Sequence, residues 1–153
     1  MDSTDKKILE ELQKNSSQPL SELSKKVGLS TTPCWNRIKK LEEDKVIISK
    51  SIIINNKKIN LPITVFLSIS IQNHTELWLK NFVKVVNKYD QIIEVHRLTG
   101  SHSDYQITIL SSSIEEYDMF QQILIKEIEC TNMSSHISLQ TIKKNNKYPL
   151  NFI

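Results

Sequence analysis

The stretch that decides the fold is residues 19–44, PLSELSKKVGLSTTPCWNRIKKLEED. Leu20, Leu23 and Val27 recur at the spacing of one face of a short helix. Gly28 follows and supplies the positive φ that a tight turn between two helices needs. A second helix then buries a stripe made of Cys34, Ile38 and Leu41. The pattern therefore predicts a helix-turn-helix.

The second of these helices has a polar and basic outer face. Ser30 is expected to cap it, and Pro33 stands in the first turn, where the missing N–H costs little. Such a face suits reading of base edges in the major groove of duplex DNA. The predicted DNA-binding residues are Ser30, Thr31, Thr32, Trp35, Asn36, Arg37, Lys39 and Lys40.

Two of these side chains have alternative roles. The Trp35 ring either stacks on the nucleic acid or packs against neighbouring protein. Arg37 either binds phosphate or forms an intramolecular salt bridge with Glu42 or Asp44. Lys39 and Lys40 are expected to bind phosphate together.

Composition and charge agree with a DNA-binding module joined to a second domain. Residues 1–60 hold 12 Lys and Arg against 8 Asp and Glu, whereas residues 61–142 hold 5 against 9. The polar N-terminus and the lack of a long apolar run argue against a signal peptide and a membrane span. Two cysteines in 153 residues argue against a disulfide framework, so we expect a reducing cytoplasm.

Before the helix-turn-helix, Asp2 is expected to cap a helix that ends near Lys14. After it, β-branched residues at 46–48 and 52–54 predict a wing-like hairpin or a linking strand. Residues 55–61 are polar and rich in turn formers. The predicted organisation is a DNA-binding domain at 1–54, a linker at 55–61 and a second domain at 62–153.

In the second domain the spacing of the apolar residues differs from that in the first. Alternating apolar residues predict strands at 63–71, 92–99, 105–110 and 136–142. Helical spacing predicts helices at 78–89 and 114–128. The order βαββαβ is typical of a ferredoxin-like sandwich. The whole chain is therefore predicted to be α+β, a winged helix-turn-helix domain joined to a ferredoxin-like sandwich.

Catalytic and metal-binding patterns are missing from the sequence. Neither a nucleophile–base constellation nor a phosphate-binding loop is recognisable, and the four histidines lack metal-ligand spacing. The sequence therefore predicts a protein that is not an enzyme and that has no cofactor or metal.

The first half resembles the leucine-responsive regulatory protein/AsnC (Lrp/AsnC) family of transcription regulators. The matching residues are Asp2, Asp5, Ile8-Leu9, Leu12-Gln13, Glu22-Leu23-Ser24, Val27-Gly28-Leu29-Ser30, Thr32-Pro33-Cys34, Arg37 and Leu41-Glu42. The family usually has glycine where Lys45 stands, which predicts a left-handed backbone at this lysine.

The second half resembles the amino-acid-sensing domain of the same family. Its matching residues are Glu94-Val95-His96, Thr99-Gly100, Asp104-Tyr105, Lys143-Lys144-Asn145-Asn146 and Pro149-Leu150. The glycine and the aspartate are separated by three residues here instead of the usual two. The effector-binding residues that this resemblance implies are Thr99, Gly100, Ser101, His102, Ser103, Asp104 and Tyr105.

Two hypotheses remain for the loop at 99–105. In one, Asp104 binds the ammonium group of an amino acid and the backbone of residues 100–103 binds its carboxylate. In the other, the loop is a plain hairpin turn, and the protein is an architectural factor that bends DNA without a ligand. The resemblance implies a transcription regulator that binds double-stranded DNA as a homodimer, assembles to a tetramer or octamer, and has no membrane partner.

Overall fold

The chain divides into two compact units. The computed structural model describes residues 1–100 and 102–152. One unit comprises Met1–Ile53 together with Ile142–Ile153, and the other comprises Ile54–Thr141. Each unit has its own hydrophobic core.

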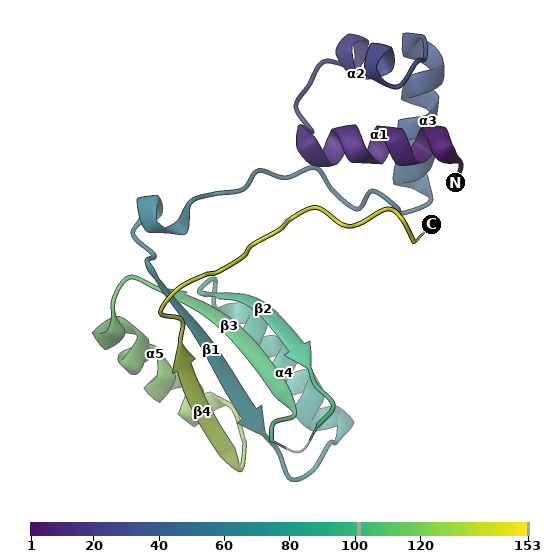
Figure 1. Cartoon of the computed structure of the whole chain (residues 1–153). Helices are drawn as coiled ribbons and strands as arrows, with labels where there is room; N and C mark the ends of the chain where they lie inside the picture. The colour runs from purple at the N-terminus through teal and green to yellow at the C-terminus, as the bar shows by residue number, and fades with distance from the viewer. Residues whose placement is uncertain (101, 153) are drawn as a thin grey trace. The chain divides into compact units, whose positions relative to one another are not determined.

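Three helices form the first unit: α1 (Ser3–Lys14), α2 (Leu20–Lys26) and α3 (Thr31–Glu43) (Figure 1). Asp2 caps α1 as predicted, because its carboxylate accepts the amides of Thr4 and Asp5 while the Asp5 carboxylate accepts the Asp2 amide. The core consists of the predicted apolar stripes, Ile8, Leu9, Leu23, Val27, Cys34, Ile38 and Leu41.

The turns of this unit match the sequence pattern with one exception. Gly28 has φ +74°, and Lys45 has φ +57°, so both predicted left-handed positions are confirmed. Ser30 occupies the N-cap of α3, but its side chain makes no capping hydrogen bond. The prediction that Ser30 caps α3 through its hydroxyl was therefore wrong. Its side chain stays exposed instead.

Residues 46–55 form neither the predicted hairpin nor a linking strand. Residues 46 and 47 lie in a bend, residues 48–55 have no regular secondary structure, and in the described part of the protein the segment has no partner strand. β-Branched residues favour a strand, but a strand forms only where a second one satisfies its hydrogen bonds. Ile48, Ile52 and Ile53 are consequently exposed. A short 3₁₀ turn, η1 (Asn56–Ile59), follows.

The second unit is an antiparallel sheet with helices on one face (Figure 1). Its elements are β1 (Ile63–Ser70), α4 (Glu76–Lys88), β2 (Ile92–Arg97), β3 (Tyr105–Ser111), α5 (Ile114–Glu127) and β4 (Asn132–Ile137). The strands lie in the order β2-β3-β1-β4. This arrangement confirms the predicted ferredoxin-like sandwich.

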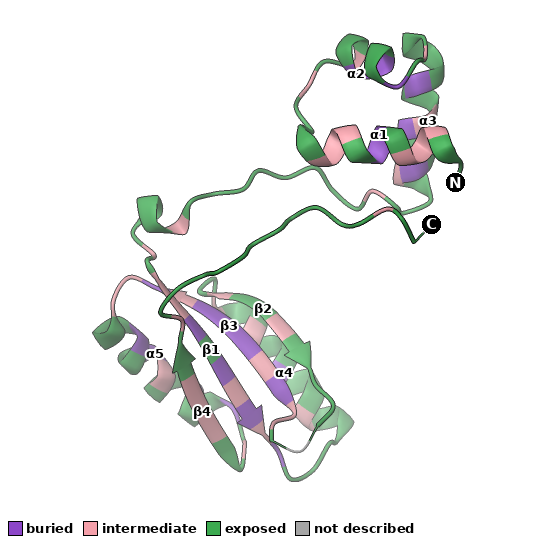
Figure 2. Cartoon of the chain, in the orientation of Figure 1, coloured by how far each residue is buried: buried purple, intermediate pink, exposed green. Residues whose placement is uncertain are grey.

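Side-chain alternation on the central strands builds the second core (Figure 2). Val65, Leu67 and Ile69 of β1 face the helices and are fully buried, as are Ile107 and Ile109 of the neighbouring β3. Side-chain hydroxyls cap both helices, since Thr75 accepts the amide of Trp78 and Ser113 accepts that of Glu116.

The last strand lies earlier in the chain than predicted. β4 begins at Asn132 and pairs with β1 from Ser70 to Val65, whereas the prediction was 136–142. This strand lies at the edge of the sheet and is mostly polar, so apolar alternation does not mark it. β1 begins at Ile63, so residues after Ser138, whose amide donates to the Thr64 carbonyl, have no partner strand.

The C-terminal segment packs within the helix-turn-helix unit. The Gln13 side-chain Nε2 donates to the Tyr148 carbonyl (3.2 Å), and the side-chain Oε1 of Gln13 accepts the Tyr148 amide. Leu150 packs against the core of the three helices. The end of the chain is therefore attached to α1.

Candidate DNA interface and effector loop

Helix α3 presents the polar face that the sequence predicted. Of the eight predicted DNA-binding residues, all except Arg37 are exposed, and Arg37 is half-buried. The turn before α3 is set by Gly28 and by the Leu29 amide, which donates to the Ser24 carbonyl (2.8 Å). The buried stripe at Cys34, Ile38 and Leu41 then turns the opposite face to solvent.

Trp35 lies on this outer face with half of its surface exposed. The ammonium group of Lys39 lies 5.3 Å from the centroid of the indole ring and 3.8 Å from a carboxylate oxygen of Glu43. Lys39 therefore lies over the ring, and the exposed half of Trp35 is available to a partner.

Arg37 forms an intramolecular clamp on the start of α1. Its Nη1 atom donates to Asp2 Oδ2 (2.7 Å) and to Asp5 Oδ1 (2.8 Å). The expected salt-bridge partners Glu42 and Asp44 were wrong, because Glu42 pairs with Lys50 (2.8 Å) and the acidic pair that faces Arg37 belongs to the first helix. Both carboxylates are also the residues of the α1 capping box.

The clamp shifts the pKa values of Asp2 and Arg37. A hydrogen bond from the Asp5 amide and another from the Arg37 guanidinium hold the pKa of Asp2 below its ordinary value of 3.8. Hydrogen bonds to Asp5 and Asp2 in turn raise the pKa of Arg37. Asp2 and Arg37 are therefore both charged at neutral pH.

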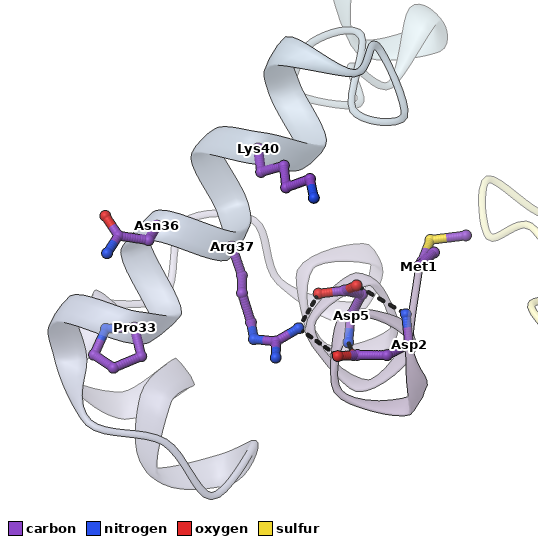
Figure 3. A pocket seen from close by; sticks show the side chains of 7 residues that line it. All are labelled: Met1, Asp2, Asp5, Pro33, Asn36, Arg37 and Lys40. Carbon is purple, nitrogen blue, oxygen red and sulfur yellow. Dashed lines mark hydrogen bonds and ion pairs between the residues drawn. The ribbon is translucent and has the colours of Figure 1, made fainter.

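A groove of about 620 Å³ lies between the start of α1 and the outer face of α3. Its lining residues are Met1, Asp2, Asp5, Pro33, Asn36, Arg37 and Lys40. Arg37 points toward the two aspartates, whereas Asn36 points away from them (Figure 3). Asn36 is thus available to a partner, and the Arg37 charge is already paired.

The predicted effector loop connects β2 to β3. The Leu98 amide donates to the Asp104 carbonyl (2.7 Å), and the Asp104 amide donates to the Ile69 carbonyl of β1 (2.8 Å). Gly100 has φ +154°, a conformation that favours glycine. Thr99, Gly100 and His102 are exposed, and Ser103 is half-buried; Ser101 lies outside the described residues.

The carboxylate of Asp104 is engaged on both oxygens. Oδ2 accepts the amide of Ile71 (2.8 Å), and Oδ1 lies 3.3 Å from Nε2 of His74. These contacts connect the loop to the chain between β1 and α4. The side chain is about 29% exposed, so one side of it still faces solvent.

Tyr105 belongs to the core and not to the loop surface. Its ring is 5% exposed and lies 5.3 Å from the Trp78 ring and 5.0 Å from the Phe82 ring, centroid to centroid. A ligand on the loop surface would therefore not reach the Tyr105 ring.

Comparison with known proteins assigns the two units. Residues 1–48 match the family model described as winged helix-turn-helix DNA-binding, and residues 64–148 match the Lrp/AsnC ligand binding domain. The glutamate uptake regulatory protein of Zymomonas mobilis is 38% identical over 98% of this chain and 91% of its own length. The chain belongs to the Lrp/AsnC family.

Solved structures of Lrp/AsnC regulators have the same fold. An AsnC family transcriptional regulator from Agrobacterium tumefaciens has a TM-score of 0.94 and 40% identity, covering 100% of this chain and 99% of its own. A transcriptional regulator from Neisseria meningitidis, described as a complex with L-methionine, has a TM-score of 0.93 and 28% identity, covering 99% and 98%. This Lrp/AsnC chain is therefore a transcription regulator with a DNA-binding helix-turn-helix and a ligand-binding domain.

Residues 1–100 and 102–152 lack two further features. No helix there is long and apolar enough to cross a lipid bilayer. The same residues contain no group of three or more His, Cys, Asp or Glu side chains placed to hold a metal ion.

Sequence reasoning missed three interactions of this Lrp/AsnC chain. It assigned Asp2 only to the helix cap, and it gave no role to Gln13 or His74. A carboxylate pair at the start of α1 was a visible signal for an arginine partner, but nothing indicated that the partner was Arg37. The contacts of Gln13 and His74 had no sequence signal, because each depends on chain segments that meet only in the fold.

Proposed function

We propose that this Lrp/AsnC regulator binds specific duplex DNA through α3 as a homodimer or a larger ring, and that an amino acid bound near loop 99–104 changes its assembly or its DNA affinity. Residues 55–61 act as the linker between the two domains, and the protein works in the cytoplasm. The observation that carries the proposal is the exposed polar face of α3, opposite a fully apolar stripe.

The DNA face is tested by two variants with different expected effects. Changing Lys39 and Lys40 together to alanine should weaken binding to specific and random duplexes alike, because phosphate contacts carry no sequence information. Asn36→Ala should instead reduce discrimination between sites, since its free amide is suited to a base edge. A gel-shift series across salt concentrations measures the affinity of both variants. If changing the two lysines has no effect at any salt concentration, the assignment of the DNA-binding face to α3 is wrong.

Dimerisation is proposed through the face of the sheet that α4 and α5 leave uncovered. Phe66 lies on this face of the central strand β1 and is 36% exposed, with Ser68 and Thr64 beside it on the same strand. One recognition helix alone has too little surface for tight specific binding, so two copies are needed.

An amino acid is the proposed effector because the ligand-binding domain matches and the Neisseria meningitidis relative is described with L-methionine. Thermal unfolding should be measured with each of the twenty amino acids. A ligand at about 100 times its Kd adds about 2.7 kcal/mol to the folded state. If no amino acid shifts the transition, the effector proposal fails while DNA binding stands.

Asp104 is the proposed counter-charge of the effector's ammonium group. Asp104→Asn keeps an oxygen for the Ile71 amide but removes the negative charge. The variant should lose stabilisation by the ligand and keep DNA binding, whereas Asp90→Asn, in the turn before β2, serves as a control with the same charge change. If Asp104→Asn binds the ligand as well as the wild type does, the pocket lies elsewhere.

One observation favours the alternative of a ligand-independent architectural protein. The Asp104 carboxylate already accepts the Ile71 amide and lies 3.3 Å from His74, so it has a structural role without any ligand. Circular-permutation gel shifts would detect DNA bending. Bending that is unchanged by all twenty amino acids would support this alternative.

A further inference from the structure

The C-terminal segment carries an unpaired positive charge on the DNA-binding unit. Lys143, Lys144 and Lys147 lie within five residues of one another and are exposed. Among the described residues, no carboxylate lies within ion-pair distance of any of the three. Residues 142–153 contain no Asp or Glu at all.

The positive charge of residues 142–153 is large compared with the net charge of residues 1–53, the other part of the same unit. Residues 1–53 hold 10 Lys and Arg against 8 Asp and Glu, a net charge of +2. Of these, Arg37 is paired with Asp2 and Asp5, and four lysines each have a carboxylate within 4 Å: Lys14, Lys26, Lys39 and Lys50. The segment adds +3, so it supplies more net positive charge to the unit than the three helices do.

The segment is held in place by contacts of its own. The Gln13 side chain bonds both the amide and the carbonyl of Tyr148, in the manner of a neighbouring strand, and Leu150 packs against the helical core. Lys147 is adjacent to this attachment. Lys143 lies five residues from Tyr148, at most about 18 Å along the chain.

The segment is attached at Gln13 of α1, and the same helix contacts α3 through Asp5 and Arg37. Gln13 is eight residues along α1 from Asp5, which contacts Arg37 of α3; at 1.5 Å per residue this is about 12 Å. The two chain segments on the path from Lys143 to Asp5 therefore add up to at most about 30 Å, apart from the side chains that join them, which is comparable with one helical turn of DNA, about 34 Å. Duplex DNA carries a phosphate charge about every 1.7 Å of its axis, so phosphates lie within reach of the segment.

We propose that Lys143, Lys144 and Lys147 form a second DNA contact, which binds the phosphate backbone beside the site read by α3. The partner is the backbone of duplex DNA, and the contact is independent of base sequence. The two hydrogen bonds between the Gln13 side chain and Tyr148, here called the Gln13 clasp, hold the segment on α1.

The test uses the full-length protein and a fluorescein-labelled mixed-sequence duplex, with affinity measured by anisotropy across a series of salt concentrations. The triple variant Lys143→Gln, Lys144→Gln, Lys147→Gln should bind at least about tenfold more weakly at low salt, and the slope of log affinity against log salt should fall by up to about 2.7. The control removes three exposed lysines of the sandwich, Lys80→Gln, Lys84→Gln and Lys126→Gln, and should leave the slope unchanged.

A second variant tests the clasp separately. Gln13→Ala keeps all three lysines but releases Tyr148, and it should lose part of the same slope, whereas Gln122→Ala on α5 should not. If Gln13→Ala binds like the wild type while the triple variant is weakened, the clasp has no role in positioning.

Three results would overturn the proposal in different ways. An unchanged slope in the triple variant removes the second contact while binding by α3 stands. Loss of assembly, seen by light scattering, with DNA binding retained would make the segment an interface between copies. A wild type that binds no duplex at any salt overturns both this contact and the proposed DNA face.

Discussion

At the scale of single residues, Arg37 shows how a side chain on the recognition helix acts within the protein. One nitrogen of its guanidinium donates to two carboxylates of α1 and thereby holds the capping box of α1 against α3. The guanidinium would have to leave these partners to bind phosphate. We therefore expect Arg37 to position α3, while Lys39 and Lys40 bind the backbone of the DNA.

Salt dependence separates these roles. Arg37→Gln should leave the slope of log affinity against log salt unchanged, although the fold becomes less stable. The double variant Lys39→Gln, Lys40→Gln should lower the slope by about 1.8, at about 0.9 per phosphate contact. Both are measured by anisotropy on one duplex. A slope that falls by about 1 in Arg37→Gln would show that this residue binds phosphate after all.

The clamp also predicts a pH dependence of stability. The pKa of Asp2 is lowered in the folded state, so its charge stabilises the fold above the ordinary value of 3.8, and this contribution is lost as the pH falls through the lower folded value. Asp2→Asn keeps a good capping side chain but removes the charge. Its melting temperature should be lower than that of the wild type at neutral pH, and the two should converge in acid. A difference that is constant across pH would contradict the role of the charge.

At the scale of elements, the end of α3 contains a local strain. Lys45 has φ +57°, a left-handed conformation that costs a residue with a Cβ atom on the order of 1 kcal/mol. The conformation persists because the amides of Val46 and Ile47 both donate to the Leu41 carbonyl, and Ile47 packs against the helical core. The strain is thus a consequence of how the chain leaves the helix.

Replacing this lysine by glycine should relieve the strain. Lys45→Gly is expected to raise the free energy of unfolding by up to about 1 kcal/mol, partly offset by the greater freedom of glycine in the unfolded chain. Asn60, with φ +61°, is the matched control, because asparagine tolerates this conformation and Asn60→Gly should gain less. Urea unfolding measures both variants. Equal gains at the two positions would argue against strain at Lys45.

At the scale of the whole molecule, the sandwich has one covered and one uncovered sheet face. The helices α4 and α5 pack on the side of Val65, Leu67 and Ile69, while Phe66 on the central strand points to the other side and stays partly exposed. An apolar side chain in the middle of an open face is suited to an interface between copies.

A single charge at that position should therefore disrupt assembly. Phe66→Glu is expected to convert the full-length protein to smaller species, since an unpaired carboxylate at the centre of an interface costs more than a surface charge. Met119→Glu on the exposed side of α5 is the control and should keep the wild-type mass. Light scattering gives both masses, and an unchanged mass for Phe66→Glu would place the interface elsewhere.

The sequence by itself determined the three helices of the first unit and the order of the elements in the second. The apolar stripes of α2 and α3, Gly28 in the turn and Asp2 at the cap act over a few residues, so each is readable without the rest of the fold. The period change after residue 61 likewise predicted the sandwich. The left-handed Lys45 was predicted from the resemblance, because the family usually has glycine at that position.

Only the tertiary structure decided which residues interact across long stretches of the chain. Arg37 and Asp2 are 35 residues apart, Asp104 and Ile71 are 33 apart, and Gln13 and Tyr148 are 135 apart. The edge strand β4 was misplaced for a related reason, since its polar residues pair with β1 and its limits are set by where β1 begins. Local patterns encode the conformation of short segments, whereas a side chain's partner depends on which distant segments the packed cores bring together.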